Sequence, residues 1–445
     1  MTPLNRTHDA SVRSWVASAN LPGSDFPIQN LPFGVFRRRG SDDAPRCGVA
    51  IGDRIVDVSK AVQAFETPAT DAAQACAEPV LNALMALPVA AVSALRGQLF
   101  ALLAQDAPAA RQLIEDALIP MAGTELLLPV RISGYTDFFA SVHHATNAGR
   151  LFRPDQPLLP NYKYVPVGYN GRAASVQLDS APVHRPRGQL RRPDGDAPAY
   201  LPCEKLDYEV ELGMLIGQGA ERQTPIAVDA AWQHLFGFCL LNDWSARDLQ
   251  AWEAQPLGPF LAKSFATSVS PWVVTAEALA PYRVAPAQRA AGDPAPLPHL
   301  SGRADQSEGA VRIVMDAHLR SQRMRKNDVP AVRLSRSDSA TLYWTPAQML
   351  AHHTSNGSSL QNGDLLGSGT ISGPDDASLG SLLEITRGGA QPLPLGADEQ
   401  RRFLEDGDEI VLTGFCERPG YARIGFGECR SIVLPANNQH QETQS

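Results

Sequence analysis

Four carboxylates in this 445-residue sequence stand in or beside segments with the pattern of β-strands. Glu209 and Glu211 lie two positions apart in KLDYEVELGMLIG, residues 205–217, where apolar and acidic residues alternate. The alternation predicts a strand with Asp207, Glu209 and Glu211 on one face, and with the Cα atoms of the two glutamates about 6.5–7 Å apart. Like charges on one face repel unless water or a cation screens them. Taken alone, the pair is better explained by the solvated face of an edge strand.

Two further carboxylates favour a cation. Asp243 follows the apolar run 236–241, which has the length and bulk of a buried strand, and Asp137 lies in GYTDFFASVHHATN. Four hard oxygen donors without a matching set of Cys or His ligands suit Mg²⁺ or Ca²⁺ far better than zinc. The sequence therefore predicts a site for Mg²⁺ and/or Ca²⁺.

The stretch after the second apolar strand concentrates polar side chains. Ser245, with Asp248 three residues on, resembles a capping box and predicts one or two helical turns. In such a turn Arg247 and Gln250 share one face. A loop rich in Pro and Gly then leads to Lys263, whose neighbours are mostly apolar. This combination fits a polar site, and it fits equally well a strand–turn–helix corner with incidental surface charge.

Two histidine pairs occur in the chain. Either His143 or His144 could act as a general base at neutral pH, because an imidazole needs little tuning there, although a structural role is the commoner use of a histidine. Glu384, a carboxylate at the end of an apolar stretch, is a candidate to orient the base. His352 and His353 lie on an amphipathic stretch, where we expect a packing role.

Glycine-rich text recurs at residues 167–172 (VGYNGR) and 362–374 (NGDLLGSGTISGP). Such loops allow backbone amides to approach an anionic ligand closely, but β-turns in a mainly β domain explain either one equally well.

The composition is that of an ordinary globular protein, with 44% apolar and 19% charged residues. A net charge of -8 argues against a nucleic-acid or anionic-membrane partner. No apolar run reaches membrane-spanning length, and the N-terminus lacks the apolar core of a signal peptide. The 6 cysteines show no CxxC pair, so a reducing, cytoplasmic compartment fits best.

Short β-rich segments separated by Gly and Pro, together with the chain length, predict a mainly β protein with some α-helix and two domains. Short β-rich pieces with a hairpin at Gly52–Asp53 indicate a small barrel-like unit, and Ala/Leu-rich text over 81–121 predicts two or three helices packed on it. Further strands are expected at 311–319 and 409–415, and a surface loop at 284–309. The predicted organisation is a loose leader (1–23), a small β domain with helices (24–125), a larger β domain (126–436) and a disordered tail (437–445).

These segments together resemble the fumarylacetoacetate hydrolase family over nearly the whole chain. The motifs that carry the resemblance, in family order, are YTDFF, HATN, LFR, PVGYNGRAASV, LDYEVELG, NDWSARDLQ, LGPFLAKSF, SPWVV and GDLLGSGTISGP. The resemblance implies an SH3-like N-terminal barrel, a C-terminal mixed β-roll that binds Ca²⁺ or Mg²⁺, and a homodimer.

The resemblance also implies roles for individual residues. The implied metal ligands are Asp137, Glu209, Glu211 and Asp243, with Lys263 and Thr267 near a second cation. The implied catalytic residues are His144 as base, Glu384 as its partner, and Arg247, Gln250 and Lys263 at the oxyanion. The implied substrate contacts are Phe139, Arg153, Tyr169, Gln250 and Thr370. The sequence departs from the family where Phe139 and Ala254 replace common tyrosines, Asn170 a histidine and His143 a glutamine.

The implied reaction is hydrolysis of a carbon–carbon bond in a small 1,3-diketo acid, the last step of tyrosine and phenylalanine catabolism. A divalent ion would act as a Lewis acid on the diketone, and a water activated by the base would attack the carbonyl beside the fumaryl group. A related decarboxylase or hydratase acting on another 1,3-diketone or a 2-oxo acid stays open as an alternative. An inactive metal-binding scaffold is a third hypothesis, but neither the base nor a ligand position is lost.

Overall fold

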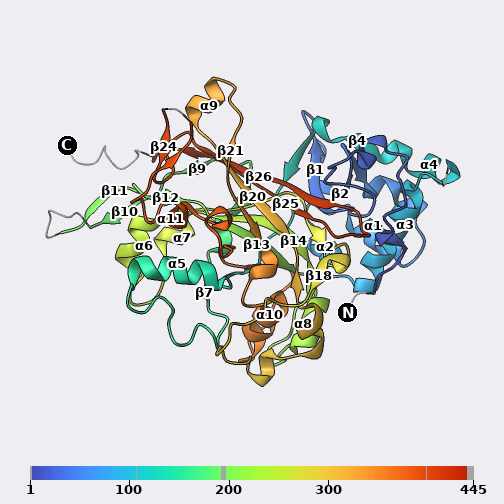
Figure 1. Cartoon of the computed structure of the whole chain (residues 1–445). Coiled ribbons are helices and arrows are strands. Elements are labelled where there is room, and N and C mark those ends of the chain that lie inside the picture. The colour runs from blue at the N-terminus through green and yellow to red at the C-terminus, as the bar shows by residue number, and fades with distance from the viewer. Residues whose placement is uncertain (1–2, 107, 192–196, 397, 438–445) are drawn as a thin grey trace.

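A computed structural model of the chain describes residues 3–106, 108–191, 197–396 and 398–437. The N-terminal part, blue in Figure 1, forms a small domain at one side of a larger C-terminal domain. The core of the small domain continues into the larger one, because its buried side chains pack with Phe236, Leu241 and Val273. The predicted mainly β architecture with a small N-terminal and a larger C-terminal domain is therefore confirmed.

A five-stranded antiparallel sheet in the order β4-β3-β2-β1-β5 forms the centre of the N-terminal domain. The predicted hairpin joins β2 and β3, and Gly52 in its turn has a φ of 56°, which favours glycine. The helices expected after residue 81 are also present. The elements are β1 (Phe33–Arg38), β2 (Arg46–Ile51), β3 (Arg54–Asp57), β4 (Leu118–Pro120), β5 (Thr124–Leu127), α1 (Ala69–Ala75), α2 (Asn82–Met85), α3 (Val89–Leu103) and α4 (Pro108–Ile114).

The prediction of a loose leader is wrong for the part of it that the structure describes. Short 3₁₀ turns occur at Arg6–His8 and Ala17–Asn20, and the side chains of Thr7 and Val16 are buried. Arg96 of α3, itself buried, donates to the Thr7 hydroxyl at 3.2 Å. A polar segment held by a buried arginine leaves no periodic pattern in the sequence. Of the predicted tail, only residue 437 lies in the described part.

A mixed sheet carries the C-terminal domain, with strand order β7-β6-β22-β13-β14-β16-β8 and β17 paired to β14. The β22–β6 and β16–β8 pairs are parallel, whereas the other pairs in the sheet are antiparallel. The strands are β6 (Tyr135–Phe138), β7 (Gly168–Asn170), β8 (Val176–Leu178), β13 (Val210–Ile216), β14 (Leu235–Asp243), β16 (Thr267–Val269), β17 (Val274–Thr275) and β22 (Leu365–Gly367).

A second sheet, in the order β21-β20-β25-β26-β9, packs on the first through β14. Phe238 and Leu240 of β14 share a core with Leu412 of β25 and Phe426 of β26. Short two-stranded ribbons complete the β structure. The elements are β9 (Val183–His184), β20 (Val314–Arg320), β21 (Val332–Asp338), β25 (Glu409–Cys416), β26 (Ile424–Leu434), and the ribbons β10 (Arg187–Leu190) with β11 (Ala199–Pro202), β12 (Leu206–Asp207) with β15 (Ser245–Ala246), β18 (Arg283–Val284) with β19 (Ala310–Val311), and β23 (Leu393–Pro394) with β24 (Gln400–Arg401).

The helices of this domain are short and lie around the sheets (Figure 1). Four of them, α5, α6, α7 and α11, carry residues with predicted catalytic roles. Their bounds are α5 (Val142–Phe152), α6 (Arg247–Glu253), α7 (Leu261–Ser264), α8 (Arg303–Glu308), α9 (Gln322–Lys326), α10 (Pro346–Thr354) and α11 (Leu382–Ile385).

Several local predictions need correction. The strand expected over 205–217 is interrupted between β12 and β13, and β13 is buried on both faces, so the solvated edge-strand explanation is wrong. Ser245 belongs to β15 and forms no capping box, because Ala246 occupies the N-cap of α6 without a side-chain hydrogen bond. The strand expected over 311–319 is split between β19 and β20. The expected loop over 284–309 contains α8 and buries Leu300.

In the described ranges, no helix is both long and apolar enough to cross a membrane. The six cysteines are all buried and unpaired.

Candidate active site

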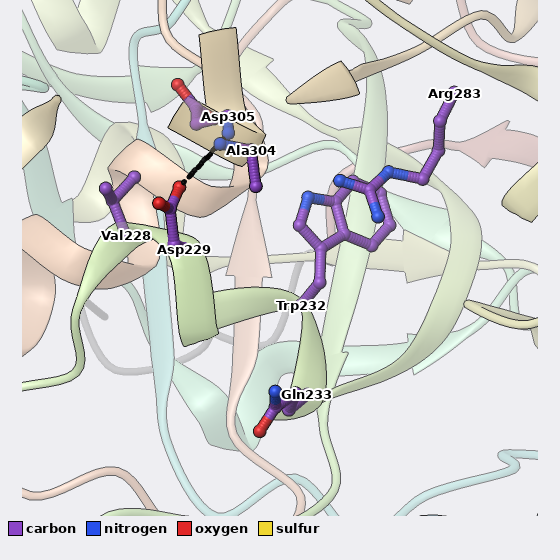
Figure 2. Close-up of a pocket in the computed structure, with 7 residues that line it drawn as sticks. All are labelled: Val228, Asp229, Trp232, Gln233, Arg283, Ala304 and Asp305. Carbon is purple, nitrogen blue, oxygen red and sulfur yellow. Dashed lines mark hydrogen bonds between the residues drawn. The ribbon is translucent and has the colours of Figure 1, made fainter. Parts of the chain in front are cut away.

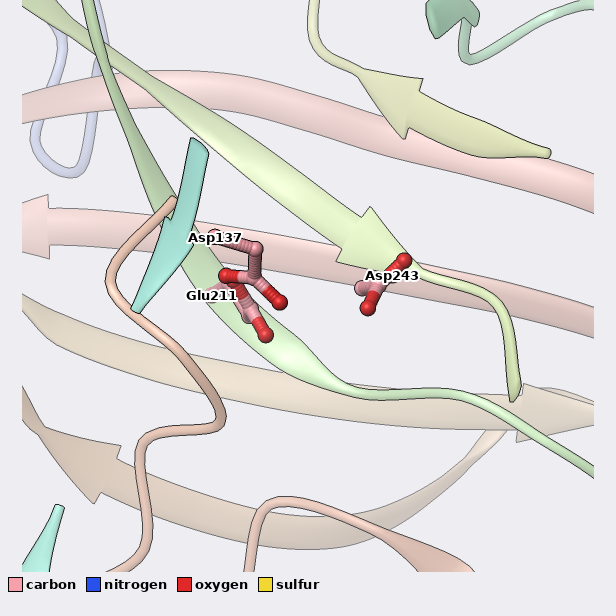
Figure 3. A group of neighbouring side chains, drawn as sticks. All are labelled: Asp137, Glu211 and Asp243. Carbon is pink, nitrogen blue, oxygen red and sulfur yellow. The ribbon is translucent and has the colours of Figure 1, made fainter. Parts of the chain in front are cut away.

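Neighbouring strands of the mixed sheet bring three carboxylates together at one end. Asp137 of β6 and Glu211 of β13 flank the short strand β22, and Asp243 ends β14, the antiparallel neighbour of β13. Figure 3 shows the three side chains as neighbours, with Asp243 beside the pair formed by Asp137 and Glu211. One oxygen from each carboxylate lies within 4.8 Å of the others, which is a spacing suited to a shared metal ion.

The three carboxylates of this cluster, Asp137, Glu211 and Asp243, favour a bound cation. Asp137 Oδ1 and Glu211 Oε1 are buried and have no hydrogen-bond partner among the described residues. Burial and the adjacent Asp243 carboxylate raise the pKa of Asp137 to about 8, and burial together with Asp137 holds the pKa of Glu211 well above its usual range. Since the donors are hard oxygens in a buried, acidic position, the residues present fit a divalent ion such as Mg²⁺ or Ca²⁺.

Two glycines lie against the carboxylate cluster. A Cβ atom at Gly367 would lie 2.5 Å from Asp137 Oδ1 and 3.0 Å from Glu211 Oε2. The backbone N–H of Gly369 donates to Glu211 Oε2 at 3.1 Å. The glycine-rich text over 362–374 therefore packs against the acidic side chains, a role that its composition alone did not distinguish from an ordinary turn.

Glu209, a predicted metal ligand, is engaged by two buried cations instead of joining the three clustered carboxylates. Lys263 Nζ lies 2.5 Å from Glu209 Oε2 and 2.6 Å from Asp243 Oδ2, while Arg247 Nη1 lies 2.7 Å from Glu209 Oε1. Burial opposes ionisation of Glu209, but Lys263 and Arg247 outweigh it and hold the pKa of Glu209 well below its usual range. Burial likewise opposes the charge on Lys263, but Asp243 and Glu209 raise the pKa of the ammonium.

Asp243 also receives two hydroxyl groups. The Tyr169 hydroxyl donates to Asp243 Oδ2 at 3.1 Å, and Thr267 Oγ1 lies 3.4 Å from Asp243 Oδ1. The structure thus brings the predicted residues Tyr169, Thr267 and Lys263 onto one carboxylate of the cluster.

The His144 imidazole contacts the Glu384 carboxylate, although the two residues are 240 positions apart in the chain. Ser141 caps α5 by accepting from the His144 backbone N–H, which places His144 in the first turn of the helix. Its Nδ1 lies 2.7 Å from Glu384 Oε2 on α11, and its Nε2 lies 3.9 Å from Glu209 Oε1. His143, in contrast, is only half-buried.

Several side chains that the sequence analysis did not identify donate hydrogen bonds to the Glu384 carboxylate. Its Oε2 accepts from the hydroxyls of Ser372 (2.8 Å) and Ser381 (2.9 Å), and its Oε1 accepts from the Asn147 side-chain amide at 2.9 Å. Burial opposes the charge, but His144 and these donors lower the pKa of Glu384 to about 2. An ionised carboxylate can only accept, so His144 Nδ1 must carry a proton, and the neutral form of this imidazole keeps its lone pair on Nε2. Two spacings in the sequence were available as signals: Asn147 lies three residues after His144 on one helix face, and Ser381 lies three residues before Glu384 in a capping-box pattern.

The remaining predicted substrate residues differ in their placement. The ring of Phe139 meets the His144 ring edge-on, with centroids 5.4 Å apart, and Gln250 Oε1 accepts from Arg247 Nη1 at 3.3 Å. Thr370 is buried, and its hydroxyl has no partner within the described part of the chain. Arg153 is exposed, and its guanidinium donates to the Pro157 carbonyl at 3.5 Å.

Two further polar features are explained by packing. His353 Nε2 lies 2.9 Å from the Thr136 hydroxyl, which agrees with the packing role expected for the second histidine pair. Figure 2 shows a cavity at which Arg283 stacks on Trp232 and Asp229 caps α8. Its volume of about 20 Å³ is enough for one water molecule but not for a substrate.

A mixed β-fold that gathers buried carboxylates beside a histidine–glutamate pair is typical of an enzyme active site, and the carboxylates form a candidate metal centre. Residues 29–129 match the family described as Fumarylacetoacetase N-terminal, and residues 134–434 match Fumarylacetoacetate (FAA) hydrolase C-terminal. The chain therefore belongs to the fumarylacetoacetate hydrolase family.

Curated relatives match over nearly their full length. The chain is 45% identical over 435 residues to a protein named fumarylacetoacetase from Oryza sativa, which covers 96% of this chain and 98% of the relative. It is 44% identical over 418 residues to the fumarylacetoacetase of Homo sapiens, with 93% and 97% covered. Among solved structures, the fumarylacetoacetate hydrolase of Exiguobacterium antarcticum shares the fold, with a TM-score of 0.50 at 16% identity over 92% of this chain and 100% of that one.

Proposed function

We propose that this chain hydrolyses the carbon–carbon bond of 4-fumarylacetoacetate to give fumarate and acetoacetate, the last step of tyrosine and phenylalanine catabolism. The observation that carries the proposal is the 2.7 Å contact between His144 Nδ1 and Glu384 beside the buried carboxylate cluster. The relatives that match at 44% and 45% identity are named for this activity.

His144 is the general base in this proposal. Glu384 holds the proton on Nδ1, so Nε2 is free to take a proton from water. The water oxygen then bonds to the carbonyl carbon beside the fumaryl group, and the bond from that carbon to the acetoacetyl carbon breaks. The electron pair of the broken bond leaves with acetoacetate, which takes up a proton, while the water oxygen remains in the new carboxylate of fumarate.

Arg247, Gln250 and Lys263 stabilise the negative charge that develops on the attacked carbonyl. Arg247 and Lys263 are buried and held in place by carboxylates, so they need no reorganisation when the charge appears. Gln250 uses its oxygen for Arg247, which leaves its amide N–H groups for the substrate. A preorganised donor of this kind commonly contributes roughly 3 kcal/mol to transition-state stabilisation.

Asp137, Glu211 and Asp243 hold the divalent cation, with Glu209, Lys263 and Thr267 around them. We propose Mg²⁺ and/or Ca²⁺, because the oxygen donors are hard and buried. Such an ion would supply Lewis-acid polarisation of a substrate carbonyl when bound.

Substrate contacts fall to residues around the cluster. The Tyr169 hydroxyl donates to Asp243, the buried Thr370 hydroxyl has no hydrogen-bond partner among the described residues, and Phe139 packs on the base. For Arg153, an exposed guanidinium is available to a carboxylate of the diketo acid.

The products separate this proposal from a decarboxylase or hydratase. Incubation of fumarylacetoacetate with the enzyme in ¹⁸O-labelled water should yield fumarate and acetoacetate in equal amounts, with one labelled oxygen in fumarate and no carbon dioxide. Release of carbon dioxide from a 2-oxo acid, with the diketone left intact, would overturn it.

We further propose that a second copy of the chain covers an apolar patch beside the site. Leu257 (97% exposed), Phe260 (65% exposed) and Trp252 lie on or between α6 and α7, and the Trp252 indole N–H donates to Gln189 of the adjacent β10. Exposed apolar patches often mark contact surfaces. Light scattering should give the mass of a homodimer, and a Leu257→Asp variant should shift toward monomer; a monomeric wild type would refute the proposal.

Six unpaired, buried cysteines support a reducing, cytoplasmic compartment.

A further inference from the structure

Asp207 lies between the two halves of the proposed site although no role has been assigned to it so far. It is fully buried in β12, next to β15, from which the chain enters α6 and Arg247. Arg247 Nε donates to Asp207 Oδ2 at 2.9 Å, while Arg247 Nη1 contacts Glu209 Oε1 at 2.7 Å. The Asp207 carboxylate therefore helps to orient Arg247, to which we assign stabilisation of the oxyanion.

The same carboxylate holds the turn that carries Glu384. Asp207 Oδ1 accepts from the backbone N–H of Leu382 at 2.8 Å, and Oδ2 accepts from that of Leu383 at 2.9 Å. These are the first two residues of α11, and Glu384 is the third. Residues more than 170 positions apart in the chain are thus joined through one side chain, since the separation between Asp207 and Leu382 is 175.

We propose that Asp207 is a positioning residue that ties Arg247 to the turn bearing Glu384, and so sets the base and the oxyanion group relative to each other. The inference rests on the proposed function for the assignment of those two groups. None of the hydrogen bonds or ion pairs of Asp207 within the described residues involves His144 or Lys263, so it acts through Arg247 and α11.

The carboxylate cannot be replaced by an amide without conflict. Oδ1 faces the N–H groups of Tyr208 and Leu382, and Oδ2 faces Arg247 and the N–H of Leu383. Whichever oxygen becomes NH₂ in Asp207→Asn, that group meets two donors. Either Arg247 or the start of α11 must then move.

The test compares Asp207→Asn with Asp57→Asn. Asp57 is also fully buried and accepts from an arginine, Arg46 Nε at 2.7 Å, but lies in the N-terminal domain. Asp207→Asn should lower kcat on fumarylacetoacetate by roughly 10- to 100-fold with KM changed less than about threefold, the pattern of a misplaced catalytic group. Asp57→Asn should lower the unfolding temperature but leave kcat near that of the wild type.

An activity-independent measurement separates failure of this inference from failure of the proposed function. The low-field imidazole N–H resonance of His144, identified by its absence in His144→Ala, should shift or broaden in Asp207→Asn and stay unchanged in Asp57→Asn. An unchanged resonance with kcat within threefold of the wild type overturns the inference. A wild type that leaves the diketone intact overturns the function, and the resonance alone then decides the role of Asp207. If Asp207→Asn does not fold, Asp207→Glu keeps the charge but misplaces it, and a wild-type kcat and resonance in that variant would overturn the inference.

Discussion

Replacing Glu384 by Gln tests whether a fixed negative charge orients the base. Gln keeps the shape of the side chain, and its oxygen can still accept from His144, Ser372 and Ser381 on the Oε2 side. Its NH₂ group would face the Asn147 amide, which can turn to present its oxygen. The variant therefore removes the charge with little change in packing.

The lowered pKa of Glu384 gives the size of the stability loss expected in Glu384→Gln. Its ordinary value is 4.5 and its value in the folded protein is about 2, so the ionised form stabilises the fold by roughly 3 kcal/mol more than the neutral form. Because the folded-state pKa is the lower one, this contribution is present above pH 4.5 and is lost as the pH falls toward 2. Glu384→Gln should thus be less stable than the wild type at neutral pH, and the difference should narrow below pH 4.5.

Chemical unfolding followed by tryptophan fluorescence at several pH values measures this difference. At pH 7 the variant should also lose about 10²–10⁴-fold in kcat, because His144 loses the negative charge that stabilises the imidazolium formed when it takes a proton from water. Glu277→Gln is a matched control, since Glu277 is buried and accepts from Asn5 and Ser93 away from the site. A Glu384→Gln enzyme with nearly full kcat and an unchanged unfolding midpoint at pH 7 would refute the reasoning.

Other perturbations address the remaining parts of the site. Exhaustive chelation should lower both turnover and the unfolding temperature, and Mg²⁺ or Ca²⁺ should restore them; verified metal-free protein that keeps both would exclude the metal site. His144→Ala should lower kcat by about 10²–10⁴-fold while His143→Ala stays active, and the reverse result would reassign the base. Phe139→Tyr should raise kcat/KM modestly, in line with a hydrogen bond contributing about 0.5–1.5 kcal/mol, whereas a marked drop would indicate a pocket shaped for another acid. Gly367→Ala places a Cβ 2.5 Å from Asp137 Oδ1 and should weaken divalent-ion binding in calorimetry, and unchanged affinity would show that the ion binds elsewhere.

The local elements of this fold were largely readable in the chain. The alternation around β13, the apolar run of β14 and the Gly52–Asp53 turn each predicted the element that forms, because side-chain period and turn chemistry act over a few residues. The identities of the site residues came instead from motifs matched to the family. Sequence alone therefore determined the domain order, the main strands and the chemistry that the side chains can perform.

Tertiary structure decided which of those side chains act together. Glu209 and Glu211 share a strand pattern, yet one is paired with Lys263 and Arg247 and the other joins Asp137 and Asp243. The difference depends on which neighbours each carboxylate meets across the sheet, and strand pairing between distant segments leaves no local signal. The docking of the N-terminal segment, the donors around Glu384 and the link through Asp207 have the same origin: each is a contact between parts of the chain that only the folded protein brings within hydrogen-bond distance.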